Sequence, residues 1–390
     1  MKGNIGDWSE VYVFLKLLSE GKLNAADSNL NAIPNVYYPI IKIIREEVTK
    51  VNSKKVLTQR EFSINGDIKI IDGSTNVHLL TIPIADFFQK SKELLDDLKI
   101  AKGLSFSFPA IETFLNSIDV KSLKAKSSNK ADIMVVVHDL HTGLKPKLGF
   151  SIKSLLGGNS TLFNAGAGTN FIFKIIKPSN TILDFQKINT DSLKQSKIKK
   201  KDRKISLRLD AIENLKFEFQ FHKIQSNNLQ LNLVLIDSQL PDILASLVYN
   251  YYKTGKSKVK ELLDEINQQN PMKFDQSKEH PFYDYKIKNF LTESALGMTP
   301  EEVWNGVYDA TGGIIIVKKS GDLACYHIYN KNEFQEYLMN NTFLEQPATS
   351  EDDNNPGFPD RLKKKPFKFG WIYEENGELY IKLNLQIRFK

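Results

Sequence analysis

The sequence predicts an α/β protein in which a mixed central sheet is flanked by helices, with additional β-rich elements in the C-terminal half. Apolar side chains recur at three- and four-residue steps over residues 7–21, a spacing typical of an amphipathic helix. Short runs rich in β-branched residues, at 131–137 and Lys147–Ser154, are typical of strands, and a turn-like segment separates them. Alternating apolar residues over 379–389 predict further strands.

Composition limits the class of protein. The chain has 390 residues, of which 41% are hydrophobic and 11% aromatic, enough to bury a substantial core and to argue against disorder. A single cysteine, Cys325, cannot form an internal disulfide, which favours a cytoplasmic location. Neither a secretion signal nor a membrane span is expected, because no stretch reaches 18 uninterrupted apolar residues. The net charge of +7 favours polyanionic partners such as nucleic acid.

Other elements follow from similar patterns. We expect helices at 39–51, Ile84–Ile100 and Pro109–Ser117, and a hairpin whose tight turn is Asn65-Gly66. In the C-terminal half the patterns predict strands at 217–221 and 229–235, helices at 241–252 and 259–266, a hairpin joining Gly313–Val317 to 323–329, and a loop at 349–365.

A polar, basic stretch divides the chain. Seven Lys or Arg residues lie between 194 and 204, and we interpret 178–204 as a linker or exposed loop. The expected domains are therefore an N-terminal domain of helices and a core at 1–177, this linker, and a C-terminal α/β region at 205–390 that extends the sheet.

Three residues on the predicted 131–154 hairpin suggest a catalytic site. Ser151 and Lys153 are two apart on one strand, so their side chains leave the same face of the sheet. Asp132 lies on the neighbouring strand, within reach if the hairpin pairs. An acid beside a two-apart pair that ends in lysine is the layout of the nucleases written P-D…(D/E)-x-K.

The chemistry of DNA cleavage explains these residue types. Carboxylates hold Mg²⁺, which prefers oxygen ligands and lowers the pKa of a bound water. A nearby lysine stabilises the charge that develops on the phosphate or orients the attacking water. By chance alone, however, an aspartate followed about twenty residues later by S-x-K is common, and Lys153 could lie at a sheet edge with its ammonium in water.

The sequence departs from the pattern at two positions. Ala131 replaces a proline that makes no metal bond, and Ser151 replaces the second carboxylate. Because a hydroxyl is a weak Mg²⁺ ligand, another acid is needed. Glu10 on the first predicted helix is the preferred donor, and Glu112 is the alternative.

Three blocks of the chain resemble the HpaII-type restriction endonucleases. The middle block carries KADIMVVV, GFSIKSLLGG and TLFNAGAGTNF; the first carries GNIGDWSEVYVFLKLLSEGKL; and the last carries GGIIIVKKSGDLACYHIYNKNEFQEYLMNNTFLEQPATS. The resemblance implies a restriction-endonuclease-like core. We therefore expect the core at 1–177 to be the nuclease and the region at 205–390 to serve DNA recognition. The resemblance also implies a type II enzyme that uses Mg²⁺ to cut double-stranded DNA at a short palindrome, CCGG in the prototype. A methyltransferase that protects host DNA is the implied genetic partner.

Mapped onto this chain, the family's motif falls on Asp132, Ser151 and Lys153, and its first-helix acid falls on Glu10. The expected metal ligands are Asp132, Glu10 and the backbone carbonyl of Ile152. Lys153 is expected beside the attacking water, and the expected products carry 5′-phosphate and 3′-hydroxyl ends. A symmetric dimer would suit a palindrome, and a monomer that makes two successive nicks is the alternative.

Other polar residues are candidates for contact with DNA. Asn164, Thr169 and Asn170 carry groups that bind base edges or phosphates, although Asn164 and Thr169 equally suit caps and turns. Lys199, Lys200 and Lys201 in the basic run either follow the DNA backbone or belong to a solvated loop.

Two other functions are also compatible with the sequence. Loss of the carboxylate at Ser151 is compatible with a nuclease-like fold that binds DNA without cutting it. The same fold is also compatible with a nuclease specific for modified or structured DNA.

Overall fold

A computed structural model of the chain describes residues 1–51, 54–125, 131–140, 142–178, 183–199, 204–347 and 369–389. Contacts divide the chain into two units. Unit 1 comprises 1–160, 295–297 and 307–337, and unit 2 comprises 161–294, 298–306 and 338–390. The functional domain boundaries expected at 178 and 205 stay a prediction.

Unit 1 is built on a nine-stranded mixed sheet with the strand order β1-β12-β11-β7-β6-β2-β3-β4-β5. Its strands are β1 (Lys22–Ala26), β2 (Ala32–Val51), β3 (Lys54–Asn65), β4 (Asp67–Asp72), β5 (His78–Ile82), β6 (Ile133–Val137), β7 (Lys147–Ser154), β11 (Gly313–Val317) and β12 (Leu323–His327). The pairs β7–β11 and β1–β12 are parallel, and the other pairs are antiparallel. The expected mixed sheet is therefore confirmed.

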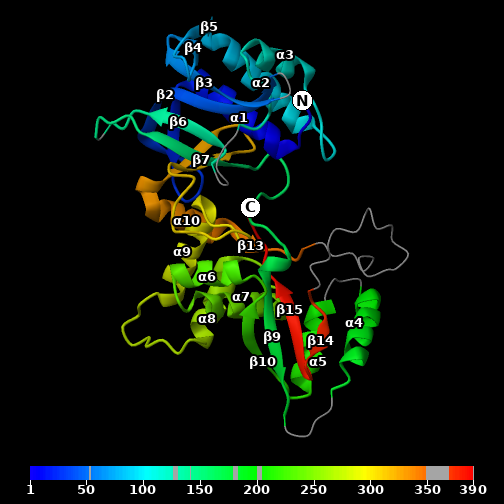
Figure 1. Cartoon of the computed structure of the whole chain (residues 1–390). Coiled ribbons are helices and arrows are strands. Elements are labelled where there is room, and N and C mark those ends of the chain that lie inside the picture. The colour runs from blue at the N-terminus through cyan, green and yellow to red at the C-terminus, as the bar shows by residue number, and fades with distance from the viewer. Residues whose placement is uncertain are drawn as a thin grey trace. The chain divides into compact units, whose positions relative to one another are not determined.

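Three helices complete the N-terminal part of unit 1 (Figure 1): α1 (Ile5–Glu20), α2 (Ile84–Ile100) and α3 (Pro109–Ser117). Helix α1 begins at a capping box formed by Asn4 and Asp7 and ends at Gly21, whose φ of 65° suits glycine. Apolar residues of all three helices share one core with β6, β7 and β11, to which β7 contributes Phe150 and Ile152. This core fixes α1 against the strands that carry the candidate site.

Unit 2 contains two antiparallel sheets, ordered β10-β9-β15-β14 and β13-β16-β8. Its strands are β8 (Thr161–Phe163), β9 (Asn170–Ile176), β10 (Glu218–Ile224), β13 (Thr342–Leu344), β14 (Ile372–Glu375), β15 (Glu378–Asn384) and β16 (Ile387–Phe389). Its helices are α4 (Phe185–Lys199), α5 (Lys204–Asn214), α6 (Asn227–Ile236), α7 (Leu240–Thr254) and α8 (Val259–Gln269), while α9 (Phe282–Leu296) and α10 (Lys331–Asn341) have residues in both units. The β-rich C-terminal elements are thus confirmed.

Two secondary-structure predictions are wrong. Residues 39–51 lie in strand β2, because pairing with β3 on one side and β6 on the other outweighs the local pattern. A register shift between Ile40 and Lys42 breaks the two-residue alternation, so that the apolar spacing imitates a helix. Residues 229–235 lie in helix α6, which begins where the Ser226 hydroxyl accepts a hydrogen bond from the Leu229 N–H at 3.3 Å.

The linker prediction is also corrected. Residues 185–199 form helix α4 rather than a loop. The predicted loop at 349–365 lies outside the described residues. Among the described helices, no single one is long and apolar enough to cross a membrane. Only α6 and α7 taken together would pass that test, and they meet at 112°.

Candidate active site on strands β6 and β7

The site begins with the pairing of β6 and β7. Ile133 lies opposite Phe150 and Met134 opposite Gly149, and the Asp132 N–H donates to the Phe150 carbonyl at 2.8 Å. This bond ties the backbone of Asp132, one residue before β6, to strand β7 next to Ser151. A side chain at Gly149 would prevent this, because its Cβ would lie 2.9 Å from the Ala131 Cβ.

Two donors on β7 hold the Asp132 carboxylate. Its Oδ2 accepts hydrogen bonds from the Ile152 N–H at 2.6 Å and from the Ser151 hydroxyl at 3.2 Å. Ser151 is buried, with 1% of its surface exposed, whereas Asp132 is half-buried. The carboxylate therefore has a fixed orientation and keeps its other oxygen for a further ligand.

The backbone of Ile152 adds a second oxygen to the site. In an extended strand the N–H and C=O of one residue point to the same edge, so the Ile152 carbonyl also points to the side of Asp132. Strand β6 begins only at Ile133, one residue after Asp132, so the β6 ladder does not use this carbonyl. It is available beside the aspartate.

Lys153 supplies a cation on the same face of β7 as Ser151. The register of the parallel neighbour places Ile316 of β11 opposite Lys153, and the lysine side chain is half-buried. Within the described ranges its ammonium forms no ion pair or side-chain hydrogen bond. It is thus free to interact with an anion that approaches the strand.

Glu10 is a second carboxylate in the electrostatic range of Asp132. Helix α1 contacts β7 directly, since the buried hydroxyls of Ser9 and Ser154 are hydrogen-bonded at 2.8 Å. Burial raises the pKa of Glu10 to about 8, and the negative charge of Asp132 adds to this shift. Lys124 partly offsets it.

The alternative acid, Glu112, has another partner. It lies on α3, and one of its carboxylate oxygens accepts a hydrogen bond from the amino terminus of Met1. The charges that act on Glu10 do not include Glu112. Glu10 is therefore the better candidate for the second carboxylate.

The donor set suits Mg²⁺. Among the residues that the structure describes, no group of three or more His, Cys, Asp or Glu side chains could hold a metal ion. Mg²⁺ does not need such a cage, because it commonly takes one or two carboxylates and retains several water ligands. Asp132, Glu10 and the Ile152 carbonyl meet that smaller requirement.

Comparisons with known proteins identify the family of the chain. A family model described as HpaII restriction endonuclease matches residues 4–389. The chain belongs to the HpaII restriction endonuclease family. The Type II restriction enzyme HpaII of Haemophilus parainfluenzae is 40% identical over 388 residues, which cover 99% of this chain and 98% of that enzyme. No solved structure matches the chain. The resemblance expected from the three sequence blocks is thus confirmed, and the family match also covers the stretch between them.

The predicted DNA-contacting residues have different positions. Asn164 is exposed, but Thr169 and Asn170 are buried in unit 2 at 1% and 0% exposure. Asn384 binds both, since its Oδ1 accepts from the Thr169 hydroxyl at 3.3 Å and its amide donates to Asn170 Oδ1 at 2.7 Å. These buried contacts tie the segment to strand β15, and contact of the two residues with DNA stays a prediction.

The basic run is described only in part. Lys199 is the last residue of helix α4, and nothing is described of its side chain. Lys200 and Lys201 lie outside the described residues. Their contact with DNA stays a prediction.

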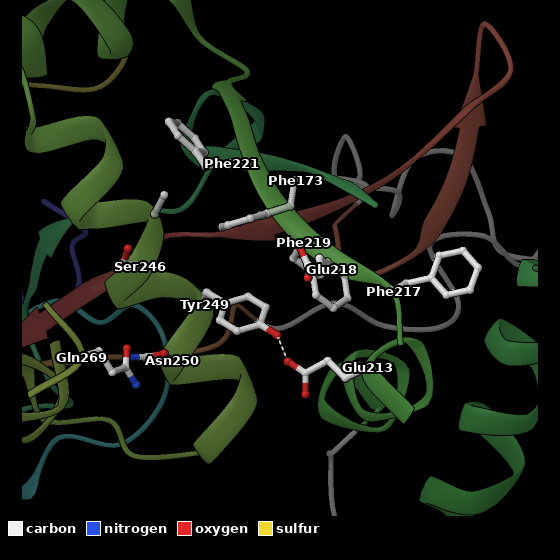
Figure 2. Close-up of a pocket in the computed structure, with 11 residues that line it drawn as sticks. Phe173, Glu213, Phe217, Glu218, Phe219, Phe221, Ser246, Tyr249, Asn250 and Gln269 are labelled. Carbon is white, nitrogen blue, oxygen red and sulfur yellow. Dashed lines mark hydrogen bonds between the residues drawn. The ribbon is translucent and has the colours of Figure 1, made fainter. Parts of the chain in front are cut away.

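Unit 2 also has a pocket that the sequence did not predict. It has a volume of about 530 Å³, and Phe173, Phe219 and Phe221 are among its lining residues. Figure 2 shows the Tyr249 hydroxyl hydrogen-bonded to Glu213 at this pocket. None of the predicted catalytic residues lines it.

Sequence reasoning missed Lys124. Its ammonium lies 2.9 Å from an Asp7 carboxylate oxygen, and its charge acts on both Glu10 and Asp132. The signal in the sequence was weak, because Lys124 is one of several lysines in a polar stretch.

Proposed function

We propose that this chain is a type II restriction endonuclease that hydrolyses double-stranded DNA at a short palindromic site, CCGG or a related sequence, in a Mg²⁺-dependent reaction. Family membership and the name of the 40% identical relative support the class of enzyme. The observation that carries the proposal is the Asp132 carboxylate, held by Ile152 and Ser151 on the strand that also presents Lys153.

In the proposed mechanism, Asp132, Glu10 and the Ile152 carbonyl would hold Mg²⁺. The chemistry that such an ion would supply is a lower pKa of a bound water and neutralisation of charge on the scissile phosphate. The Ile152 N–H and the Ser151 hydroxyl keep the Asp132 carboxylate oriented throughout. Ser151 therefore positions the aspartate, and Glu10 supplies the negative charge that a second carboxylate would otherwise bring.

Lys153 has the role of a charge-stabilising residue. Its ammonium lies on the face of β7 that carries Ser151, and it donates hydrogen bonds to the attacking water or to a non-bridging phosphate oxygen. In-line attack on phosphorus leaves a 5′-phosphate and a 3′-hydroxyl. Cleavage of both strands of a palindrome suits a homodimer, with two successive nicks by a monomer as the alternative.

The expected biological setting follows from this activity. The enzyme would act on DNA in the cytoplasm, and a DNA methyltransferase that recognises the same site would protect the host. The single buried Cys325 suits a reducing compartment.

Digestion of a DNA of known sequence, followed by mapping of the fragment ends, tests the proposal. We expect discrete fragments with 5′-phosphate ends when Mg²⁺ is present, and none with Lys153→Ala. Smeared or absent fragments would contradict site-specific cleavage.

A DNA-binding protein without nuclease activity is the second candidate, and the serine at position 151 is the observation that favours it. A gel shift on an unmodified duplex without any cleavage would support this candidate. Cleavage confined to methylated or branched DNA would instead indicate a modification- or structure-dependent nuclease.

A further inference from the structure

The N-terminal turn of α1 brings a second lysine to the candidate site. Asp7 accepts a hydrogen bond from the Asn4 N–H at 2.9 Å, and its carboxylate also lies 2.9 Å from the Lys124 ammonium. Glu10 follows Asp7 by three residues, so the two acids lie on the same side of the helix. Asp7 therefore holds Lys124 next to the acid that is proposed to bind metal.

The backbone before Lys124 is anchored independently of that lysine. The carbonyls of Ser122 and Leu123 accept hydrogen bonds from the buried Arg45 guanidinium, and the Lys121 N–H donates to the Glu47 carboxylate at 2.8 Å. Arg45 and Glu47 form a buried ion pair at 2.7 Å. This network fixes the segment without help from the Lys124 side chain.

The Lys124 side chain itself faces water. Its exposed fraction is 64%, whereas that of Asp7 is 17%. An exposed ion pair of this kind contributes little to stability. A need to anchor the segment does not explain the lysine at position 124, because Arg45 and Glu47 already anchor that segment.

The position of Lys124 suits a phosphate. Its charge acts on Glu10 and Asp132, so it lies in the electrostatic field of both proposed metal ligands. Attack on a phosphodiester adds one negative charge to the phosphate, and a cation at its edge stabilises that state. Lys153 supplies one such cation on β7, and Lys124 would supply another from the loop beside α1.

We propose that Lys124 binds a backbone phosphate of the DNA at the active site and that Asp7 positions its ammonium for this contact. The inference rests on the proposed function and adds a residue to its DNA-binding surface. In the DNA complex the Lys124 ammonium donates to the phosphate while Asp7 keeps it beside Glu10.

The experiment compares two variants that remove the same ion pair. Lys124→Gln loses the cation, whereas Asp7→Asn loses the anion and keeps an oxygen for the Asn4 N–H. Duplex binding is measured in EDTA over a range of salt concentrations. Lys124→Arg is the conservative variant. Lys121→Gln is the matched control, because Lys121 pairs with Asp119 in the same segment.

We expect Lys124→Gln to weaken duplex binding about fivefold and to lower the slope of log affinity against log salt by about 0.9, the value of one phosphate contact. Lys124→Arg should restore the slope. Lys121→Gln should leave it unchanged. Asp7→Asn keeps the cation but loses the residue that positions it, so it should weaken binding less than Lys124→Gln does and leave the slope unchanged. If Lys124→Gln unfolds at a much lower temperature than the wild type, the other two variants still test the inference. Lys124→Arg keeps the positive charge at this position, and Asp7→Asn removes the ion pair but keeps the lysine.

A structural role would give a different pattern. Asp7→Asn and Lys124→Gln would then weaken binding equally, and the salt slope would stay the same. That pattern would overturn this inference. So would a Lys124→Gln enzyme that still cleaves DNA and binds the duplex as tightly as the wild type does. Neither result would contradict the proposed function. If the wild type neither binds nor cleaves DNA, the proposed function fails, and this inference fails with it.

Discussion

The Asp132 carboxylate accepts a hydrogen bond from the Ile152 N–H at 2.6 Å, across the start of the β6–β7 ladder. A backbone donor of this kind keeps its position when side chains around it change. The aspartate therefore does not depend on Lys153 for its orientation. Because the orientation of Asp132 does not depend on Lys153, we expect variants of these two residues and of their neighbours to differ in their effects on cleavage and stability.

Lys153→Ala should lower the rate of the cleavage step without unfolding the protein. Loss of a preorganised cation at the reacting phosphate costs about 10²–10³-fold in rate. Duplex affinity should fall much less, because the ammonium is one of several cations along the DNA. Single-turnover cleavage and a gel shift on the same duplex measure the two effects. Equal losses of rate and affinity would contradict this role.

Ser151→Ala should have a modest effect. The hydroxyl donates one neutral hydrogen bond to Asp132 at 3.2 Å, and such a bond contributes about 1 kcal/mol, or roughly fivefold in rate. The Ile152 N–H still holds the carboxylate in this variant. Single-turnover cleavage at saturating Mg²⁺ measures the change. A loss of activity as complete as that of an aspartate variant would mean that the serine oxygen ligates the metal directly.

Glu10 predicts how stability depends on pH in the absence of metal. Its pKa of about 8 in the folded state lies above the ordinary value of 4.5. Between these values the native protein keeps a proton that the unfolded chain releases, so the free energy of unfolding falls as pH rises. Glu10→Gln should remove this part of the fall, because the amide does not titrate.

Thermal melts of the wild type and Glu10→Gln at pH 5 and at pH 8 test that expectation. Without Mg²⁺ the variant should gain stability relative to the wild type as the pH rises. Adding Mg²⁺ at pH 8 should stabilise the wild type and leave the variant almost unchanged. If the melting temperature changes with pH by the same amount in both proteins, Glu10 does not titrate in this range.

Gly149→Ala should destabilise unit 1. An added Cβ would lie 2.7 Å from the Asp309 carbonyl oxygen and 2.9 Å from the Ala131 Cβ. Crowding of this kind costs about 1–3 kcal/mol. Since Ala131 precedes Asp132, cleavage should weaken as well. Denaturant unfolding measures the first effect, and an unchanged midpoint would show that the backbone yields without cost.

Local patterns predicted much of the site. The two runs of β-branched residues became β6 and β7, and the helix at 7–21 became α1, because each run matched the length and the residue types of one element. The contact between the Asp132 and Ser151 side chains followed from that pairing. The parallel addition of β11 beside β7 did not, since the two strands lie far apart in the sequence.

The failures also have physical causes. Strand β2 was taken for a helix because a register shift disturbs its alternation. The sequence did not predict that Thr169 and Asn170 are buried and hydrogen-bonded to Asn384, because that residue lies more than two hundred positions away. Lys124 was missed because only its ion pair with Asp7 distinguishes it from other surface lysines. In each case a contact between residues that are far apart in the sequence determined the structure, and local patterns do not reveal such contacts.

The affinity for Mg²⁺ is the decisive measurement. Calorimetry in the presence of duplex DNA measures it for Lys153→Ala, which cleaves slowly and serves as the background protein, and for the same protein that also carries Asp132→Asn or Glu10→Gln. We predict saturable binding in the background protein and at least a roughly tenfold loss of affinity when either acid is replaced. Unchanged Mg²⁺ affinity in the Asp132→Asn protein would contradict the account.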